Sequence, residues 1–204
     1  MKLQFEGEKI MANKENKVVY GLKNAHYAKL SFDETGAPVY ATPVAMKGAV
    51  ELSLEPESND IQFSADDDAS FFAESENQGY SGTLTLANLS YAFRADILGE
   101  LDDDTDGTIT EIADAKMSPF ALLFQFDGDV NKTRHLVYYC IPSRAKLGSK
   151  TGKDIEGVEM TFKAKQLDLG ESKLVKTQTT TEQSAKYLDW FTQVYVKGQT
   201  PAEG

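Results

Sequence analysis

The sequence predicts a mainly β (α+β) domain in which two packed antiparallel sheets form a sandwich or barrel, with one or two short helices against them. Two observations predict this class. Short runs in which polar and apolar residues alternate recur along most of the chain and are separated by turn residues. A helical period is confined to two short segments, near residues 88–98 and 181–194.

The first predicted strands lie in the N-terminal quarter. Residues 27–32 and 39–40 flank a turn at residues 33–36 that contains a glycine, so they predict a hairpin. Residues 49–54 alternate as a half-buried strand, and we expect Pro56 to end it.

A long hairpin with an acidic tip is predicted next. Residues 61–65 and 70–75 are strand-like and enclose Asp66, Asp67 and Asp68. These negative charges would discourage the hairpin from pairing with the edge of a wrong partner.

A strand followed directly by a short helix is predicted over residues 79–100. Within residues 79–86, threonines and a serine alternate with an apolar face made of Tyr80, Leu84 and Leu86. Asn88 or Ser90 can cap the helix and Gly99 can end it. We expect its apolar residues on one face: Tyr91, Phe93, Ile97 and Leu98.

A second short helix is predicted from Thr181 or Ser184 to Val194. We expect Tyr187, Leu188 and Phe191 on one face, with Trp190 beside them.

The length of 204 residues predicts one domain, over residues 18–197, between an N-terminal extension (1–17) and a flexible tail (198–204). Residues 6–10 are what a translated ribosome-binding site would encode, which suggests Met11 as an alternative native start to Met1. The intact mass of the protein from its natural source distinguishes the two starts.

Charge and hydropathy limit the function classes. The formal net charge is −11, which argues against a protein that holds nucleic acid by its phosphates. A single cysteine, Cys140, excludes an internal disulfide and predicts a small buried hydrophobe rather than a reactive thiol. There is neither a secretion-signal pattern nor an apolar run long enough to span a membrane, so we expect the product to stay in the cytoplasm until it is assembled or released.

Candidate catalytic residues are few. We expect structural roles for His26 and His135, because neither lies in a recognisable hydrolase or metal-binding pattern. Residues 147–154 partly match a phosphate-binding loop but lack its order of glycines and lysine, which predicts an exposed, mobile loop. The sequence therefore predicts no enzyme and no cofactor.

One motif has the spacing of a calcium loop. Asp102, Asp104 and Asp106 occupy its first, third and fifth positions, and Gly107 the sixth. The twelfth position, which should supply a bidentate carboxylate, is Ala113. We therefore favour a hairpin turn at Asp106-Gly107 with a solvated acidic tip, and keep a calcium site as the alternative.

The segment Gly-Tyr-x-Gly-x-Leu-Thr-Leu from Gly79, followed by Phe-Arg-x-Asp-Ile-Leu-Gly-Glu from Phe93, resembles the major tail proteins (tail tube proteins) of long-tailed siphophages that infect Gram-positive bacteria. Residues 120–129 are similar to the family's apolar strand that ends in an acidic turn. Residues 135–140 resemble the strand paired with it, and residues 159–164 a later strand.

The resemblance covers residues 18–190 and departs from the family at residues 144–145, where Arg-Ala replaces an expected Arg-Pro. It implies a tail-tube-like fold and a structural protein of the virion, assembled in the host cytoplasm. Copies would form hexameric rings, stacked into a tube through which DNA passes without specific binding. Tape measure and tail terminator proteins would be its partners, and the acidic charge of the chain would keep DNA phosphates from adhering to the lumen.

The working surfaces of such a protein are its contacts with other copies. We predict that the hairpin over residues 61–75 stacks onto an adjacent ring, and that residues 18–22 form a second contact. The residues assigned to these contacts are Ile61, Phe63, Asp66, Asp67, Asp68, Phe71, Phe72, Val19 and Tyr20. An alternative for Phe71 and Phe72 is that they cap the core of their own subunit.

A second hypothesis assigns the chain a function of another class. A calcium-assisted β-sandwich binding module, for example for carbohydrate, would use the Asp102 loop together with exposed aromatic residues such as Tyr80 or Trp190.

Overall fold

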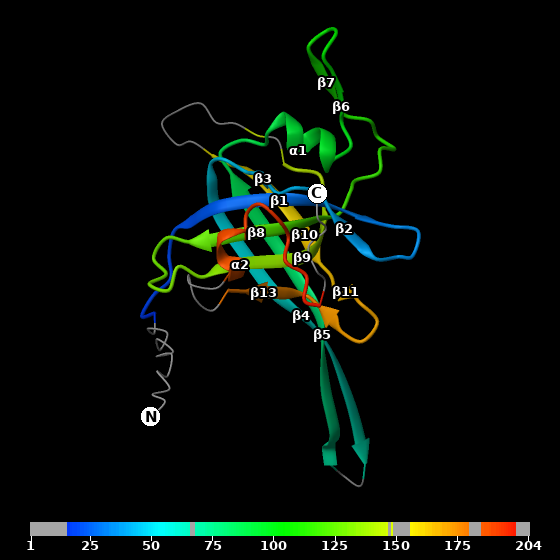
Figure 1. Cartoon of the computed structure of the whole chain (residues 1–204). Coiled ribbons are helices and arrows are strands. Elements are labelled where there is room, and N and C mark those ends of the chain that lie inside the picture. Colours follow the sequence, from blue (N-terminus) through cyan, green and yellow to red (C-terminus); the bar gives the residue numbers. More distant parts are fainter. Residues whose placement is uncertain (1–15, 66–67, 147, 149–155, 180–184, 199–204) are drawn as a thin grey trace, which may run out of the picture.

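Nine strands form one antiparallel sheet in the computed structural model, which describes residues 16–65, 68–146, 148, 156–179 and 185–198. Seven strands follow one another across the sheet in the order β2-β1-β8-β9-β10-β5-β4, while β3 pairs with β1 and β13 pairs with β9 (Figure 1). Their bounds are β1 Leu22–Phe32, β2 Pro38–Tyr40, β3 Val44–Ala45, β4 Ala49–Ala65, β5 Asp68–Leu86, β8 Phe120–Phe126, β9 Arg134–Pro142, β10 Val158–Ala164 and β13 Lys176–Gln178.

Two small sheets and two short helices complete the described part of the chain. The small sheets pair β6 (Leu101–Asp103) with β7 (Thr108–Thr110), and β11 (Leu167–Asp168) with β12 (Lys173–Leu174). The helices are α1 (Tyr91–Asp96) and α2 (Ala185–Leu188). The predicted mainly β class with short helices is therefore confirmed. No described helix has the length and apolar character needed to cross a membrane.

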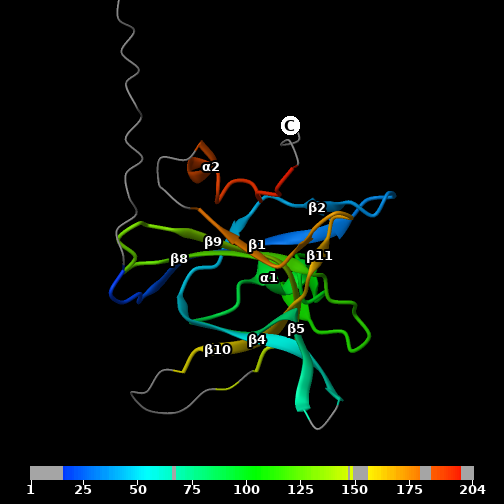
Figure 2. The ribbon, with the colours of Figure 1, turned by 90° about the horizontal axis from the view of Figure 1, so that it is seen from below.

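The large sheet bends so that β1, β8 and β9 lie in one layer and β10, β5 and β4 in the other (Figure 2). Between these layers, side chains from both halves form one apolar cluster, to which Tyr27, Phe120 and Phe162 contribute fully buried rings. The end strands β2 and β4 are not paired with each other, so the sheet does not close into a barrel.

A second apolar cluster lies on the opposite face of β1, β8 and β9. The C-terminal segment covers this face with Trp190, Val194 and Val196, which pack on sheet residues that include Leu123 and Tyr138. Because β8 is covered on both faces, nearly every residue of its Phe-Ala-Leu-Leu-Phe-Gln-Phe sequence is buried.

The helix predicted near residues 88–98 is α1. The Ser90 hydroxyl caps it by accepting a hydrogen bond from the Phe93 amide at 3.2 Å, and Gly99 follows it with a φ of +70°. Phe93 is buried as predicted, but Tyr91 is 66% exposed. Tyr91 is the first residue of a helix of only six residues, and the Arg94 guanidinium lies over its exposed ring, 5.9 Å from the centroid.

The predicted C-terminal helix was too long. Only residues 185–188 are helical, and turns follow; residues 180–184 lie outside the described residues. Tyr187 and Trp190 are buried, whereas Leu188 is 78% exposed, so its predicted place on the apolar face was wrong. The segment follows the sheet surface, where the Trp190 indole donates to the His135 carbonyl at 3.3 Å, instead of continuing the helix.

The prediction that Pro56 ends its strand was also wrong. β4 runs through Pro56, which pairs with Tyr80 of β5. β4 is the last strand of the sheet, and an edge strand tolerates a residue without an amide hydrogen because one side of the strand has no partner to receive it.

Candidate functional site

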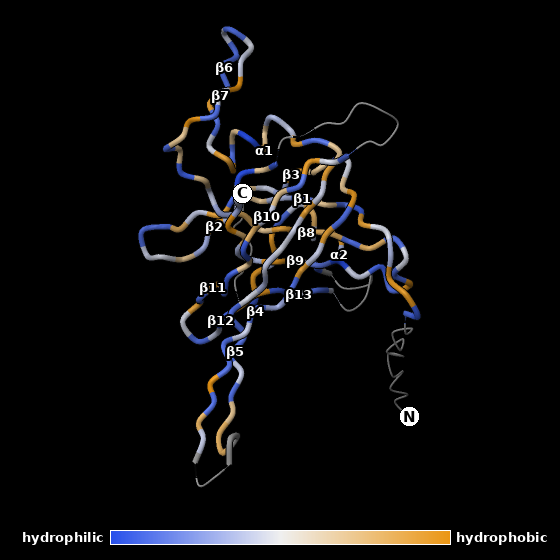
Figure 3. Tube along the Cα trace, turned by 180° about the vertical axis from the view of Figure 1, so that it is seen from behind, coloured by the Kyte–Doolittle hydropathy of each residue, from blue (hydrophilic) through white to orange (hydrophobic). Residues whose placement is uncertain are grey.

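The outer half of the β4–β5 hairpin projects away from the body, and we call residues 57–79 the arm (Figures 1 and 3). β10 pairs with β5 only from Tyr80 to Leu86, so beyond Tyr80 the arm consists of two strands alone. Among the described residues, the outer edges of both arm strands have no strand partner. A two-stranded ribbon of this kind is at best marginally stable in water unless something packs on it.

Four large apolar side chains of the arm are exposed: Ile61 (48%), Phe63 (60%), Phe71 (63%) and Phe72 (49%). The register pairs Phe63 with Phe72, so Ile61, Phe63 and Phe72 share one face of the ribbon. Phe71 is the neighbour of Phe72 and therefore lies on the other face. Neither phenylalanine belongs to the two apolar core clusters of the described residues, and both faces of the arm present apolar surface.

The arm also holds most of the net charge of the chain. Residues 57–79 contain seven acidic residues and no lysine or arginine, while the whole chain has a net charge of −11. The acidic residues are Glu57, Asp60, Asp66, Asp67, Asp68, Glu74 and Glu76. Asp66 and Asp67 lie outside the described residues, and the backbone of Asp68 begins β5.

A β-bulge marks the junction between arm and body. Glu57 pairs with Gly79 but Ser58 pairs with Asn77, which leaves Gln78 as the extra residue. Gly79 has a φ of +116°, and a Cβ there would lie 2.0 Å from the Ala164 carbonyl oxygen. Only glycine therefore fits at this position without displacing backbone.

Side chains from β10 and the segment after it hold the junction in place. Lys163 forms an ion pair with Glu57 at 3.3 Å, and the Gln166 amide donates to the Asn77 carbonyl. The Phe162 ring packs directly on Gly82, where a Cβ would be 2.2 Å from the ring. These contacts fix the base of the arm to the sheet, although no described strand pairs with its outer part.

The predicted second contact, at residues 18–22, lies beside the β8–β9 turn. Val18, Val19 and Tyr20 are 67%, 45% and 65% exposed, and Val130 of the turn is 58% exposed. The Gly128 amide donates to the Tyr20 carbonyl at 2.9 Å, and the Tyr20 ring lies against Gly128. We call the exposed surface formed by Lys17, Val18, Val19, Tyr20, Val130 and Lys132 the N-terminal patch.

A buried carboxylate anchors this patch. Asp129 is 6% exposed and accepts hydrogen bonds from the Asn16 side chain (2.7 Å) and from the Asn131 and Thr133 amides (2.8 Å each), while Asn16 also accepts from the Val130 amide at 2.9 Å. Burial would raise the pKa of Asp129, but these hydrogen bonds outweigh burial and lower the pKa to about 2.

The Asp102 motif forms the predicted hairpin, with β6 and β7 on either side of the Asp106-Gly107 turn. Its carboxylates serve the turn itself, since Asp103 accepts from the Thr105 amide at 2.8 Å and Asp106 from the Thr108 amide at 3.0 Å. In the described ranges, no group of three or more histidine, cysteine or acidic residues is placed to hold a metal ion.

Both histidines take part in ring stacking. His26 stacks on Phe191 with centroids 4.7 Å apart, and His135 stacks on Phe124 at 5.0 Å. Burial lowers the pKa of His135. Cys140 is buried in the core as predicted, and burial raises the pKa of its thiol. Most of the predicted loop at residues 147–154 lies outside the described residues.

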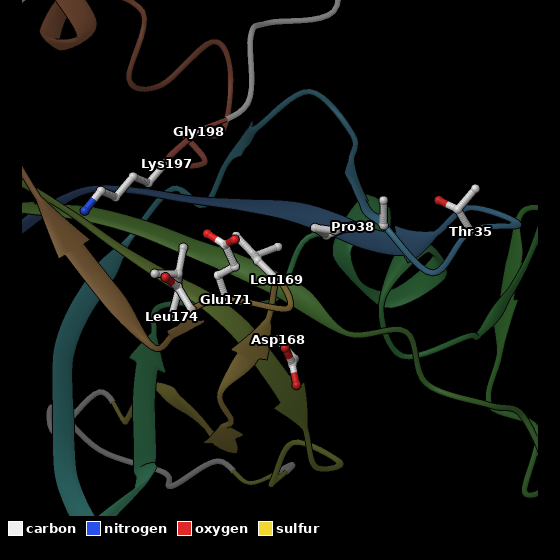
Figure 4. A pocket seen from close by; sticks show the side chains of 10 residues that line it. Thr35, Pro38, Asp168, Leu169, Glu171, Leu174, Lys197 and Gly198 are labelled. Atoms are coloured by element: carbon white, nitrogen blue, oxygen red, sulfur yellow. The ribbon is translucent and has the colours of Figure 1, made fainter.

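An open hollow of about 550 Å³ lies between the β1–β2 turn, the β11–β12 hairpin and the C-terminal residues (Figure 4). Its charged side chains, Asp168, Glu171 and Lys197, are spread along its length and do not converge on one point. The hollow therefore lacks the grouped polar residues of a small-molecule site.

Sequence reasoning missed the parts that hold these surfaces in position. The roles of Lys163 and Asp129 depend on contacts with residues more than a hundred positions away along the chain. The close spacing of Gly79 and Gly82 was the one signal available, because glycines inside a strand often mark a bulge or a close approach.

No protein-family model matches this sequence, and no curated protein matches it. Among solved structures, the tube terminating cap of the anti-feeding prophage is similar to this chain, with a TM-score of 0.40 and 13% identity over 85% of this chain and 100% of that one. The sheath/tube terminator of the extracellular contractile injection system PVC, in its extended state, has a TM-score of 0.39 and 11% identity over 82% of this chain and 99% of that one. A chain of the PVC sheath-tube complex, also extended, has a TM-score of 0.37 and 12% identity over 79% and 90%.

Proposed function

We propose that this chain is a structural protein of a phage-type tail, a major tail protein whose copies assemble through the arm. The supporting observation is the arm itself, which exposes apolar side chains on both faces and leaves both strand edges open. Soluble monomers rarely expose several large apolar side chains together, so a surface of this kind is typical of one that a partner protein covers. The resemblance of residues 18–190 to tail tube proteins suggests that the partner is another copy.

In this proposal the copies form hexameric rings that stack into the tail tube of a virion. Assembly takes place in the host cytoplasm, tape measure and tail terminator proteins bind the same tube, and DNA passes through the lumen. The net charge of −11 supports passage without adhesion, because acidic walls repel phosphates. The protein acts through its contact surfaces rather than through a reaction.

Phe72→Asp tests the proposal. Phe72 is half exposed in the single chain, so the substitution should leave the free energy of unfolding, measured by urea denaturation, within about 0.5 kcal/mol of the wild-type value and abolish assembly. Wild-type protein, concentrated and examined by light scattering and negative-stain electron microscopy, should form rings or tubes.

Leu101→Asp is the matched control, since it places the same charge on an exposed apolar residue of β6, at the opposite end of the molecule from the arm (Figure 1). It should assemble as the wild type does. Unfolding of Phe72→Asp would show that Phe72 is a core residue, and assembly of Phe72→Asp would show that the arm is not the contact.

A further inference from the structure

We propose that the arm of one copy docks on the N-terminal patch of a second copy, so that the two surfaces are the two sides of one repeating contact. This inference rests on the self-assembly proposed above and adds which surface of the second copy receives the arm.

The charge of the arm excludes another arm as its partner. Two arms laid together would bring Asp60, Glu74 and Glu76 of each copy into one contact, whereas the arm has no lysine or arginine and Lys163 of β10 balances only Glu57. Like charges placed opposite each other destabilise strand pairing and suppress association. The surface that receives the arm must therefore combine apolar groups with basic side chains.

The N-terminal patch has both properties. Its apolar groups are Val18, Val19, Tyr20 and Val130, and Lys17 and Lys132 are exposed beside them. Of the two acidic residues in the adjoining turn, Asp127 forms an ion pair with Lys23, and Asp129 keeps its negative charge but is buried, so the exposed charges of the patch are those of its lysines. The patch thus complements the arm in charge and in apolar surface.

Two other places with exposed apolar residues carry acidic side chains and do not fit the arm. Phe32 and Val39 flank a turn that contains Asp33 and Glu34. Leu101 is followed directly by three aspartates.

The arm and the patch also lie on separate parts of the molecule, in the outer half of the β4–β5 hairpin and beside the β8–β9 turn (Figures 1 and 2). A pair of copies joined through one arm and one patch keeps the other arm and the other patch available. A contact of this heterologous type continues from copy to copy, as the growth of a ring or a tube requires.

Two variants, each with one of the two surfaces disrupted, test the pairing. Phe72→Asp disrupts the arm and leaves the patch intact, whereas Val19→Asp disrupts the patch and leaves the arm intact. Both residues are exposed, so urea midpoints should match the wild type. Sedimentation velocity then measures each variant alone and an equimolar mixture of the two, with Leu101→Asp as the control.

We expect each variant alone to associate at least about tenfold more weakly than the wild type, as the loss of an interface anchor does. The mixture should form a one-to-one complex that grows no further, because it contains one working arm and one working patch. This complex should weaken as salt rises, since opposite charges are screened.

The other outcomes separate the two proposals. Self-association of Val19→Asp, which has an intact arm, would overturn the docking of the arm on the patch but leave self-assembly standing. If higher salt strengthened that association, the contact would be between two arms. Two inactive variants that do not complement each other would also overturn the docking. A wild-type protein that stays monomeric under every condition would overturn self-assembly itself.

Discussion

The two halves of the β4–β5 hairpin have the same strand pattern and opposite environments. In the inner half, Leu84 and Leu86 are fully buried and Leu52 and Leu54 pack against the core. In the outer half, Phe63 and Phe72 lie on the opposite face of the same two strands and are about half exposed. The difference arises because β10 and the bent sheet cover one half and nothing described covers the other. An apolar side chain in an alternating strand is thus buried or exposed according to which elements lie beside it.

Phe162→Ala should have the largest effect, because it removes the buried β10 ring that packs on the inner half of the hairpin at Gly82. We expect a loss of about 3–5 kcal/mol in the free energy of unfolding, measured by urea denaturation. Phe72→Ala makes the same change in the arm and should cost about 0.5 kcal/mol or less. Equal losses would show that the arm is part of the folded core.

Gly79→Ala tests the junction between the halves. The new Cβ would collide with the Ala164 carbonyl at a backbone angle that disfavours other residues, so we expect a loss of about 2–3 kcal/mol in thermal denaturation. Gly107→Ala is the control: it has a φ of +69° but no atom within 4 Å, and should cost only about 1 kcal/mol. Equal costs would mean that the close approach at Gly79 is unimportant.

Lowering the pH should release the anchor of the N-terminal patch. The pKa of Asp129 is about 2 in the folded chain against 3.8 ordinarily, so its stabilisation is complete above about pH 4 and is lost as the pH falls towards 2. The shift corresponds to about 2 kcal/mol in the free energy of unfolding. Urea denaturation between pH 7 and pH 2 should show this loss of stability in the wild type and not in Asp129→Asn. The same pH dependence in both proteins would assign it to other carboxylates.

Much of the secondary structure was predictable because it depends on local chemistry. The Asp33 carboxylate accepts from the Thr35 and Ala37 amides in the first predicted turn, and Ser90 caps α1, both within a few residues of sequence. Pro56, Tyr91 and Leu188 were misjudged for the opposite reason. Whether a proline ends a strand, or an apolar side chain is buried, depends on which element lies beside it.

The sequence indicates which segments could form contacts, but not which of their side chains are exposed or what lies beside them. Residues 61–75 and 18–22 could be singled out as apolar segments, one next to an acidic tip. Their exposure, and the placing of Val130 and Lys132 beside residues 17–20, follow from strand pairing over more than a hundred residues.

The sequence by itself determined the mainly β class, the turns, the cap of α1 and the concentration of negative charge in the arm, because alternation, capping and charge are local properties of the chain. Only the tertiary structure decided that the sheet bends into two layers without closing, that β4 continues through Pro56, and that the arm extends beyond the last strand that could cover it. These features depend on long-range pairing and burial, which no short stretch of sequence contains.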